Sequence, residues 1–375
     1  MAERGVLRTE PGKPDAGVSE REQKILGIIE TARAKRPRFK DETVTMAHGA
    51  GGKATQTLIE GLLVPALGSE SLEELGDSGV VRIDGLGLAI STDSFVVRPM
   101  RFPGGSIGEL AVNGTVNDLA MAGAEPIALS LSLILEEGLP AEDLRTEVEA
   151  IAGAAEAAGV EIVTGDTKVV ERGHADGMYV CTAGVGKLDD RAQLSTSSLQ
   201  PGDRIIVSGS IGEHGTAIML SRGEFELESE IASDTRSLWP ATDVLLSAAG
   251  ASLRCMRDAT RGGVASALNE LARASGVAMT VREGDVPVHP SVAGAAEMLG
   301  IDPMYIANEG KFVAFVAPER SEEALAALRK VEGCEDAVEI GEVKTEPPGM
   351  VLVETAFGGK RVMDMLAGDP LPRIC

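Results

Sequence analysis

The stretch that decides the fold runs from Gly104 to Leu135 and reads GGSIGELAVNGTVNDLAMAGAEPIALSLSLIL. Its first three residues open a helical pattern that continues to about Ala122. The apolar run Ile127–Leu135 follows and is typical of a buried strand. A helix followed at once by a buried strand predicts an α/β fold built of α and β layers.

Further elements of both kinds flank this stretch. Upstream, two strands, Val80–Ile83 and Leu88–Thr92, meet at the hairpin-like turn Asp84–Gly87. Downstream, a helix over Ala141–Ala158 is closed by Gly159, which favours the backbone conformation of a helix end. Strands over Glu161–Thr164 and Met178–Val185 then complete a first α/β domain.

A polar segment without periodicity, Asp189–Gly202, separates this domain from a second alternating series that begins with a strand at Arg204–Ser208. We expect two domains with an extended C-terminal tail. The predicted divisions are a leader over 1–43, an N-terminal domain over 44–188, a linker over 189–203, a C-terminal α/β domain over 204–355 and a tail over 356–375.

The leader combines a charged, Gly- and Pro-rich start with a short helical pattern from Ser19 to about Ala34, which Pro37 ends. It is either an appendage that docks on the main body or a solvated tail, and we favour the tail. It has no apolar stretch of the signal-peptide type, which predicts a cytoplasmic protein.

The charge balance excludes several classes of partner. Asp and Glu outnumber Lys and Arg by 58 to 35, giving a formal net charge of −23. Such a field repels nucleic acid and anionic membrane surfaces, so we expect neither as a partner. The four cysteines (Cys181, Cys255, Cys334 and Cys375) are scattered and suggest neither a disulfide framework nor a zinc knuckle.

The glycine-rich stretch His48-Gly-Ala-Gly-Gly-Lys53 precedes an amphipathic helix from Ala54 to about Leu63. Gly51 and Gly52 would let backbone N–H groups approach a phosphate, and Lys53 would add a positive charge. The stretch is not a Walker A loop, because G-x-x-x-x-G-K-[ST] does not occur in the sequence. An ordinary glycine-rich turn explains the same residues.

Four aspartates stand beside strand ends or helix starts: Asp93, Asp118, Asp166 and Asp258. Carboxylates that converge from several loops could bind Mg²⁺ together with phosphate oxygens, although each Asp alone is more often a cap or turn former. Asn113, Asn117 and Asp118 form a polar stripe on an otherwise apolar helix. A metal–phosphate cluster would supply the partners that this stripe needs.

Three further residues are candidates for catalysis. Lys168 lies two residues after Asp166, so both side chains point to one face of an extended segment, and Lys168 could contact phosphate or carry a proton. Glu309 could act as a general base. Cys375 ends a Pro-stiffened arm, where we expect a mobile, exposed thiol that needs a nearby cation such as Arg373 or Lys168 to ionise. Solvated charges and an accidental terminal cysteine are the alternative interpretations.

Taken together, these segments resemble one family. The chain from about Val44 onward is similar to the HypE carbamoyl dehydratases of nickel–iron hydrogenase assembly, within the superfamily of aminoimidazole ribonucleotide synthetase and selenophosphate synthetase. The resemblance rests on the motifs around the residues above, on Phe102–Gly108 and Asn308–Lys311, and above all on the closing Pro372-Arg-Ile-Cys375.

The resemblance implies a two-domain aminoimidazole ribonucleotide synthetase-like architecture that dimerises through its first domains, with ATP bound near the dimer interface. It implies Mg²⁺ at Asp93, Asp118 and Asp166. The implied nucleotide-binding residues are Gly51, Gly52, Lys53, Asn113, Asn117, Asp118, Thr164, Asp258 and Asn308. The implied catalytic residues are Cys375, Lys168 and Glu309.

The implied reaction is ATP-dependent dehydration of an S-carbamoyl group on Cys375 to a thiocyanate. A HypF carbamoyltransferase would load the thiol, and a HypC–HypD complex would accept the cyanide. Two alternatives remain: another ATP-dependent synthetase of the selenophosphate type, and a nucleotide-binding scaffold without turnover. The first would be expected to carry a reactive Cys near the glycine loop, whereas no cysteine precedes Cys181.

Overall fold

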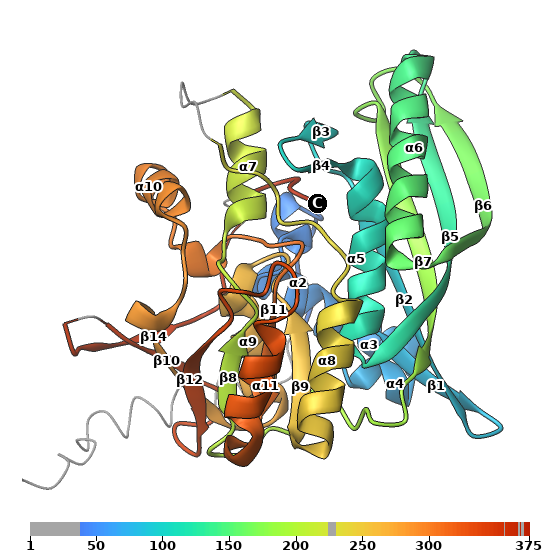
Figure 1. Ribbon diagram of the computed structural model, residues 1–375. Coiled ribbons are helices and arrows are strands. Elements are labelled where there is room, and N and C mark those ends of the chain that lie inside the picture. The colour runs from blue at the N-terminus through green and yellow to red at the C-terminus, as the bar shows by residue number, and fades with distance from the viewer. Residues whose placement is uncertain (1–37, 224–229, 356, 367, 369–370) are drawn as a thin grey trace, which may run out of the picture. The chain divides into compact units, whose positions relative to one another are not determined.

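The computed structural model describes residues 38–375 except 224–229, 356, 367 and 369–370, and it contains two main β-sheets (Figure 1). The helical pattern predicted for Ser19 to Ala34 lies outside the described residues. Within the part that is described, no helix is long and apolar enough to cross a membrane.

The first sheet has five strands in the order β1-β2-β7-β5-β6. The predicted hairpin is confirmed, but its turn is tighter than expected: Ile83 pairs with Leu86, and Asp84 and Gly85 occupy the turn with φ of 50° and 87°. Two positive φ angles are what a two-residue turn of type I′ requires. The strands are β1 (Gly79–Ile83), β2 (Leu86–Phe95), β5 (Ala124–Glu136), β6 (Glu161–Val170) and β7 (Met178–Leu188).

Two helices cover one face of this sheet. The expected helix is α5 (Ile107–Met121), and the Ser106 side chain caps it by accepting a hydrogen bond from the N–H of Gly108. The second helix is α6 (Ala141–Ala158), which ends at Gly159 with φ 70° as expected. A small hairpin of β3 (Arg101–Phe102) and β4 (Gly105–Ser106) precedes α5.

The opposite face of the five-stranded sheet carries no helix of the described chain (Figure 1). Strand β6 forms one edge of this sheet, and nearly all of its residues are exposed. Ile90 on β2 is 47% exposed on the uncovered face. This face therefore exposes apolar side chains that no helix of the described residues covers.

The second sheet has seven strands in the order β14-β13-β10-β12-β8-β11-β9, and helices cover both faces. On β11, Phe312 and Ala314 pack toward α8 and α11, whereas Val313 and Phe315 pack toward α9. This alternation explains why β11 is fully buried. The strands are β8 (Arg204–Val207), β9 (Leu253–Asp258), β10 (Ala278–Arg282), β11 (Phe312–Val316), β12 (Val338–Lys344), β13 (Val351–Glu354) and β14 (Lys360–Met363).

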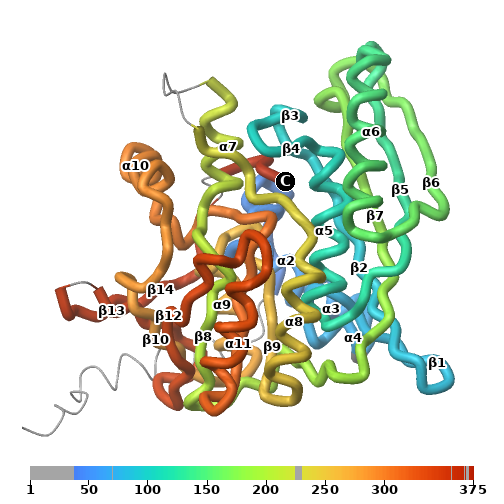
Figure 2. Tube along the Cα trace, in the orientation of Figure 1, coloured from blue at the N-terminus to red at the C-terminus, as the bar shows by residue number. Residues whose placement is uncertain are grey.

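The helices of the second part lie between its strands in the sequence: α7 (Glu213–Ser221), α8 (Trp239–Ala249), α9 (Gly263–Ala274), α10 (Pro290–Leu299) and α11 (Ser321–Leu328). The segment 189–203, between the two sheets, carries neither helix nor strand. Ala120 and Met121 of α5 share a core with α8, so α5 joins the two halves (Figure 2).

The N-terminal part of the described chain is short and helical. After the glycine stretch come α2 (Lys53–Leu58), one π-helical turn (Ile59–Leu63), α3 (Val64–Leu67) and α4 (Glu70–Glu73). The end of the chain lies between α7 and α5, where Ile374 and Cys375 share a hydrophobic cluster with Ile107 and Leu110 (Figures 1 and 2).

Candidate active site

Three carboxylates converge where α5 meets the second sheet. One oxygen each of Asp77, Asp118 and Asp258 lies within 4.8 Å of the others. Asp77 precedes β1, Asp118 lies on α5 and Asp258 ends β9. Three hard oxygen donors at this spacing fit a Mg²⁺ ion, which prefers carboxylate and phosphate oxygens.

The electrostatics agree with such a site. Burial raises the pKa of Asp118 well above its ordinary value, and the neighbouring Asp258, Asp77 and Asp93 raise it further. Burial likewise raises the pKa of Asp258 to about 6, although Arg257 opposes the shift. Carboxylates that repel one another in a buried site are stabilised as anions by a bound cation, so the donor set and its field both favour a divalent metal.

Arginines and hydroxyls hold the three carboxylates in place. Arg257 pairs with Asp77 at 2.9 Å, and Ser91 donates its hydroxyl to Asp118. Ser78 donates to the backbone oxygen of Asp118 at 2.8 Å. Sequence reasoning missed Asp77. Its one signal was its place in Gly76-Asp-Ser78, directly before a strand, as for the other acids.

Cys375 lies beside this cluster and is only 7% exposed, so the expectation of an exposed thiol is wrong. Residues 371–373 form a turn rather than an extended arm, with φ 58° at Arg373. Burial raises the pKa of the Cys375 thiol to about 12; Arg261 opposes this shift, while Glu309 and Asp93 add to it. Apolar contacts with α5 and α7 seat the tail, and sequence reasoning did not find them.

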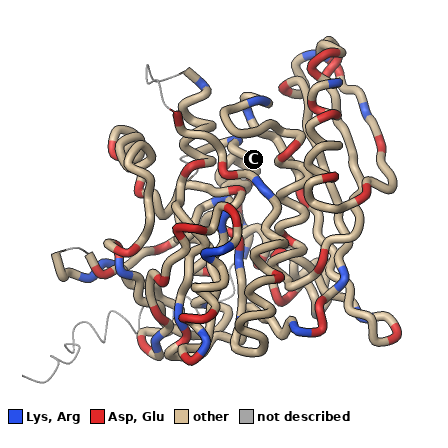
Figure 3. The backbone as a smooth tube through the Cα atoms, in the orientation of Figure 1, with Lys and Arg blue, Asp and Glu red and all other residues tan. Residues whose placement is uncertain are grey.

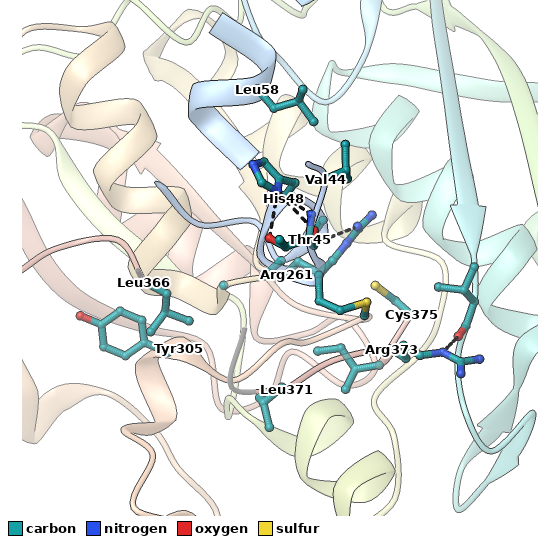
Figure 4. Close-up of a pocket in the computed structure, with 16 residues that line it drawn as sticks. Val44, Thr45, His48, Leu58, Arg261, Tyr305, Leu366, Leu371, Arg373 and Cys375 are labelled. Atoms are coloured by element: carbon teal, nitrogen blue, oxygen red, sulfur yellow. Dashed lines mark hydrogen bonds between the residues drawn. The ribbon is translucent and has the colours of Figure 1, made fainter. Parts of the chain in front are cut away.

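The cation beside Cys375 is Arg261, not Arg373 or Lys168. Arg261 follows Asp258 in Asp258-Ala-Thr-Arg-Gly-Gly263, and its guanidinium lies 3.6 Å from Asp93. Arg261 and Cys375 both line a cavity of about 340 Å³ (Figure 4). Arg373 instead pairs with Asp176 on the rim of the first sheet.

Glu309 is the candidate base that the structure places near Cys375. It is 3% exposed, and burial raises the pKa of its carboxyl well above the ordinary value, with Asp93, Asp258 and Asp234 adding to the shift. The backbone N–H groups of Glu309 and Gly310 donate to the two carboxylate oxygens of Asp234 at 3.0 and 3.1 Å. This clamp fixes the turn that carries Glu309.

Asp166 and Lys168 do not lie at the carboxylate cluster. Asp93 pairs across the sheet with Thr182, which is buried on the helix-covered face, whereas Asp166 aligns with Ser132 and Cys181 on the uncovered face. β6 is also three strands from β2, roughly 14 Å at the usual strand spacing. One Mg²⁺ therefore cannot bind Asp93 and Asp166 of the same chain.

Lys168 and Thr164 share this outer face with Asp166. As the sequence spacing predicted, Lys168 and Asp166 point the same way, and they form an exposed ion pair. Hydrogen bonding to Lys168 lowers the pKa of Asp166. Acidic and basic residues are interspersed along the described chain (Figure 3).

The glycine stretch packs against the protein itself. A Cβ on Gly51, whose φ is 71°, would lie 2.6 Å from the backbone oxygen of Arg261, and one on Gly52 would lie 2.5 Å from that of Leu366. Lys53 pairs with Asp364 at 2.7 Å. Close backbone packing therefore accounts for both glycines without a ligand, and their contact with ATP stays a prediction.

The asparagines predicted to bind nucleotide form hydrogen bonds mainly with backbone groups of the protein. The Asn117 amide nitrogen donates to the backbone oxygens of Arg236 and Glu309, and its oxygen accepts from the N–H of Leu238. Asn308 binds backbone groups in the same way, and Asn113 donates to Thr235. Asn113 and Asn117 of the polar stripe thus have protein partners in the segment 235–238, and their contact with ATP stays a prediction.

Comparisons with known proteins place these residues in a family. Two family models match, the N-terminal domain of AIR synthase related proteins over residues 75–188 and the C-terminal domain over residues 200–353. The carbamoyl dehydratase HypE of Bradyrhizobium diazoefficiens is 47% identical over 337 residues, which cover 90% of this chain and 97% of the relative.

Two solved structures agree with this match. A HypE–HypF complex contains a chain that is 41% identical, with a TM-score of 0.78 and coverage of 82% of this chain and 99% of the other. A HypE in complex with ATP is 44% identical, with a TM-score of 0.74 and coverage of 89% and 100%.

Proposed function

Since the chain belongs to the HypE family and is therefore a carbamoyl dehydratase of hydrogenase maturation, we propose that it acts on an S-carbamoyl group carried by its own Cys375. The observation that supports this proposal is the place of Cys375: buried, and beside Arg261, Glu309 and the carboxylate cluster. The thiol that holds the substrate is thus already at the residues suited to transform it.

In the proposed reaction, the carbamoyl oxygen attacks the γ-phosphorus of ATP, ADP departs and the amide nitrogen gives up one proton. The resulting phosphorylated thioimidate loses its second N–H proton to a base. The C–O bond then breaks and inorganic phosphate departs, so that Cys375 carries a thiocyanate. An amide oxygen is a poor leaving group, so the phosphoryl transfer makes the dehydration possible.

Glu309 is the proposed base for the second proton. Its raised pKa makes the ionised carboxylate a stronger base than an exposed glutamate. Arg261 would offset the negative charge that accumulates around Asp93 and the phosphorylated oxygen. The fold already holds the Glu309 carboxylate and the Arg261 guanidinium in place.

Mg²⁺ is part of the proposal, with Asp77, Asp118 and Asp258 as its carboxylate ligands and Asp93 nearby. Bound there, the ion would neutralise phosphate charge. ATP belongs to the proposal as well, supported by the similar HypE that was solved with ATP.

We also propose that two copies of the chain pair through the uncovered face of the five-stranded sheet. That face exposes apolar side chains such as Ile90, and it carries Thr164, Asp166 and Lys168. A second copy would bury the apolar surface and bring its Asp166 and Lys168 toward the first copy's nucleotide. This arrangement would restore the roles predicted for these residues.

The proposed partners are a HypF carbamoyltransferase, since a similar HypE was solved with HypF, and a HypC–HypD complex as cyanide acceptor. We also propose a cytoplasmic location, where hydrogenase assembly would take place. The net charge of −23 would repel nucleic acid and anionic membrane surfaces, so we propose neither as a partner.

Mass spectrometry of the C-terminal peptide tests the function. The protein is carbamoylated at Cys375 by HypF, freed of HypF, and given ATP and Mg²⁺. We expect the peptide to lose one water in the active protein, and Glu309→Gln to bind ATP but lose the water at least ~100-fold more slowly. ATP binding without loss of water would instead indicate a scaffold, and unchanged turnover of Glu309→Gln would remove Glu309 from its role.

A further inference from the structure

The last residues of the chain are held from two sides, mostly through their backbone. On the first side, the segment that follows β2 supplies two donors: the N–H of Val96 lies 3.1 Å from the backbone oxygen of Cys375, and the N–H of Arg98 lies 3.2 Å from that of Arg373. These two hydrogen bonds attach the backbone of the tail to the segment at the end of β2.

On the second side, α7 supplies two side chains. His214 Nε2 lies 2.6 Å from the carbonyl oxygen of Ile374. Arg222, directly after α7, donates from Nη2 to the carbonyl oxygens of Pro372 and Arg373 at 2.5 and 2.9 Å. Three successive carbonyl groups before Cys375 are therefore bound by α7 and the residue that follows it.

The hydrogen bonds define the state of His214. A carbonyl oxygen only accepts, so Nε2 carries the proton that is donated to Ile374. Ser233 Oγ lies 2.8 Å from Nδ1 and accepts from the N–H of Thr235, so its own hydroxyl proton is free to go to Nδ1. With these two hydrogen bonds, both nitrogens of a neutral imidazole ring have a partner. The ring is fully buried and packs edge-on against Phe102.

Among the described residues, none forms a hydrogen bond with the sulfur of Cys375. Its backbone oxygen is bound by Val96, while the side chain faces the cavity beside Arg261 (Figure 4). Pro372, Arg373 and Ile374 are recognised by groups that do not touch the sulfur. The same contacts can therefore hold the tail whether the sulfur carries a proton, a carbamoyl group or a cyano group.

We propose that His214 and Arg222 form a latch that seats the C-terminal tail and holds the Cys375 sulfur at the carboxylate cluster. They are positioning residues that act through the tail backbone, and the inference rests on the proposed function of Cys375. Release of the latch frees the tail for loading and unloading by partner proteins, and closure returns the loaded sulfur to Glu309 and Arg261.

The latch is tested first by the reactivity of Cys375 in the full chain without partners. Arg222→Ala and His214→Phe each remove donors to the tail, and the phenyl ring preserves the packing on Phe102. We expect alkylation of Cys375 by iodoacetamide to speed up about tenfold, the change that a loss of about 1.4 kcal/mol produces. Alkylation of Cys375 in the denatured chain is the reference for the intrinsic reactivity of the thiol.

A matched variant controls for the loss of an arginine. Arg320 also donates through its guanidinium to a backbone carbonyl, that of Ala248, and it does not contact the tail. Arg320→Ala should leave the alkylation of Cys375 unchanged. His214→Gln retains an N–H donor near the position of Nε2 and should restore slow alkylation at least in part.

The second test separates loading from chemistry. In single-turnover experiments on carbamoylated protein, Arg222→Ala should lose water about tenfold more slowly than the unchanged protein. The rate at which HypF loads Cys375 should not fall. A residue that merely supports the fold would lower both rates and the melting temperature together.

Several outcomes would overturn the latch. Unchanged alkylation in Arg222→Ala would do so, and so would equal losses in loading and dehydration. If His214→Phe fails to fold, Arg222→Ala alone decides. If the unchanged protein loses no water at all, the proposed function fails, and the alkylation rates still decide whether the latch exists.

Discussion

The guanidinium of Arg261 lies 3.6 Å from the carboxylate of Asp93, and the same guanidinium is the main positive charge acting on Cys375. Nη1 of Arg261 also donates to the backbone oxygen of Gly49 at 2.8 Å. One side chain thus joins the glycine stretch, the first sheet and the reactive tail, and its positive charge favours any anion formed at the sulfur.

Replacing Arg261 with Gln should therefore slow the dehydration of carbamoylated Cys375 by about a hundredfold, the usual effect of losing one group that stabilises developing negative charge. The pKa of the free thiol should rise as well, because Arg261 is the group that lowers it. Single-turnover rates and the pH dependence of alkylation measure the two effects. Arg261→Lys, which keeps the charge, should recover part of both; equal rates for Gln and Lys would show that the charge is not what matters.

The docking of the tail should weaken in alkaline solution. The ordinary pKa of the thiol is 9.0, and the docked state raises it to about 12 through burial, with Glu309, Asp93 and Asp258 adding to the shift against Arg261. A group whose pKa is higher in the docked state stabilises that state below its ordinary pKa. This stabilisation is lost as the pH rises from about 9 toward 12.

Alkylation of Cys375 measured between pH 7 and 10 should accordingly increase tenfold per pH unit without a plateau. In Arg222→Ala, whose tail is released, the rate of alkylation should level off near pH 9. A plateau near pH 9 in the unchanged protein would mean that the thiol is not buried in solution.

Much of the fold follows from the sequence because its signals are local. The α6 helix was predicted with its exact ends, since an apolar periodicity and a closing Gly159 define both. The β1–β2 hairpin was predicted at the right place, although its turn is Asp84-Gly85 rather than Asp84–Gly87. The fold class and the family, read from the same residues and the closing Cys375, are confirmed by the comparisons.

The site was only partly predictable, because it depends on which face of a strand a residue occupies and on distant packing. Asp166 carries the same local pattern as Asp93, yet the register of the sheet turns the two to opposite faces. The protein partners of Asn117 lie more than a hundred residues away, at Arg236 and Leu238, and the sequence did not predict them. No local pattern reports such contacts.

The glycine stretch offers a test of packing against ligand binding. Gly51 has a φ of 71° and no room for a Cβ, which would lie 2.6 Å from the backbone oxygen of Arg261, whereas nothing lies within 4 Å of a Cβ on Gly49. Gly51→Ala should destabilise the protein by about 1–3 kcal/mol, the usual range for such backbone strain. Gly49→Ala should change stability by less than about 0.5 kcal/mol.

Chemical unfolding in the absence of nucleotide measures both free energies. If Gly51→Ala keeps full stability and loses only ATP affinity, the glycine serves the ligand rather than the packing.

Lys168 and Cys375 lie on different sides of the first sheet. Lys168 lies on the uncovered outer face, whereas Cys375 lies beside Glu309 on the inner side of the same chain. If two copies pair through that face, Lys168 of one copy serves the tail of the other. Lys168→Ala and Cys375→Ala should each be inactive alone: the first lacks the lysine in both copies, and the second has no sulfur to load.

Mixed dimers of the two variants should regain activity. In them, the one remaining Cys375 belongs to the Lys168→Ala chain and faces the intact Lys168 of the Cys375→Ala chain. After subunit exchange, about half of the chains should be in mixed dimers, and loss of water at their single loaded peptide measures the recovery. A lysine that acted within its own chain would leave the mixture as inactive as its parts, because no chain in it carries both residues.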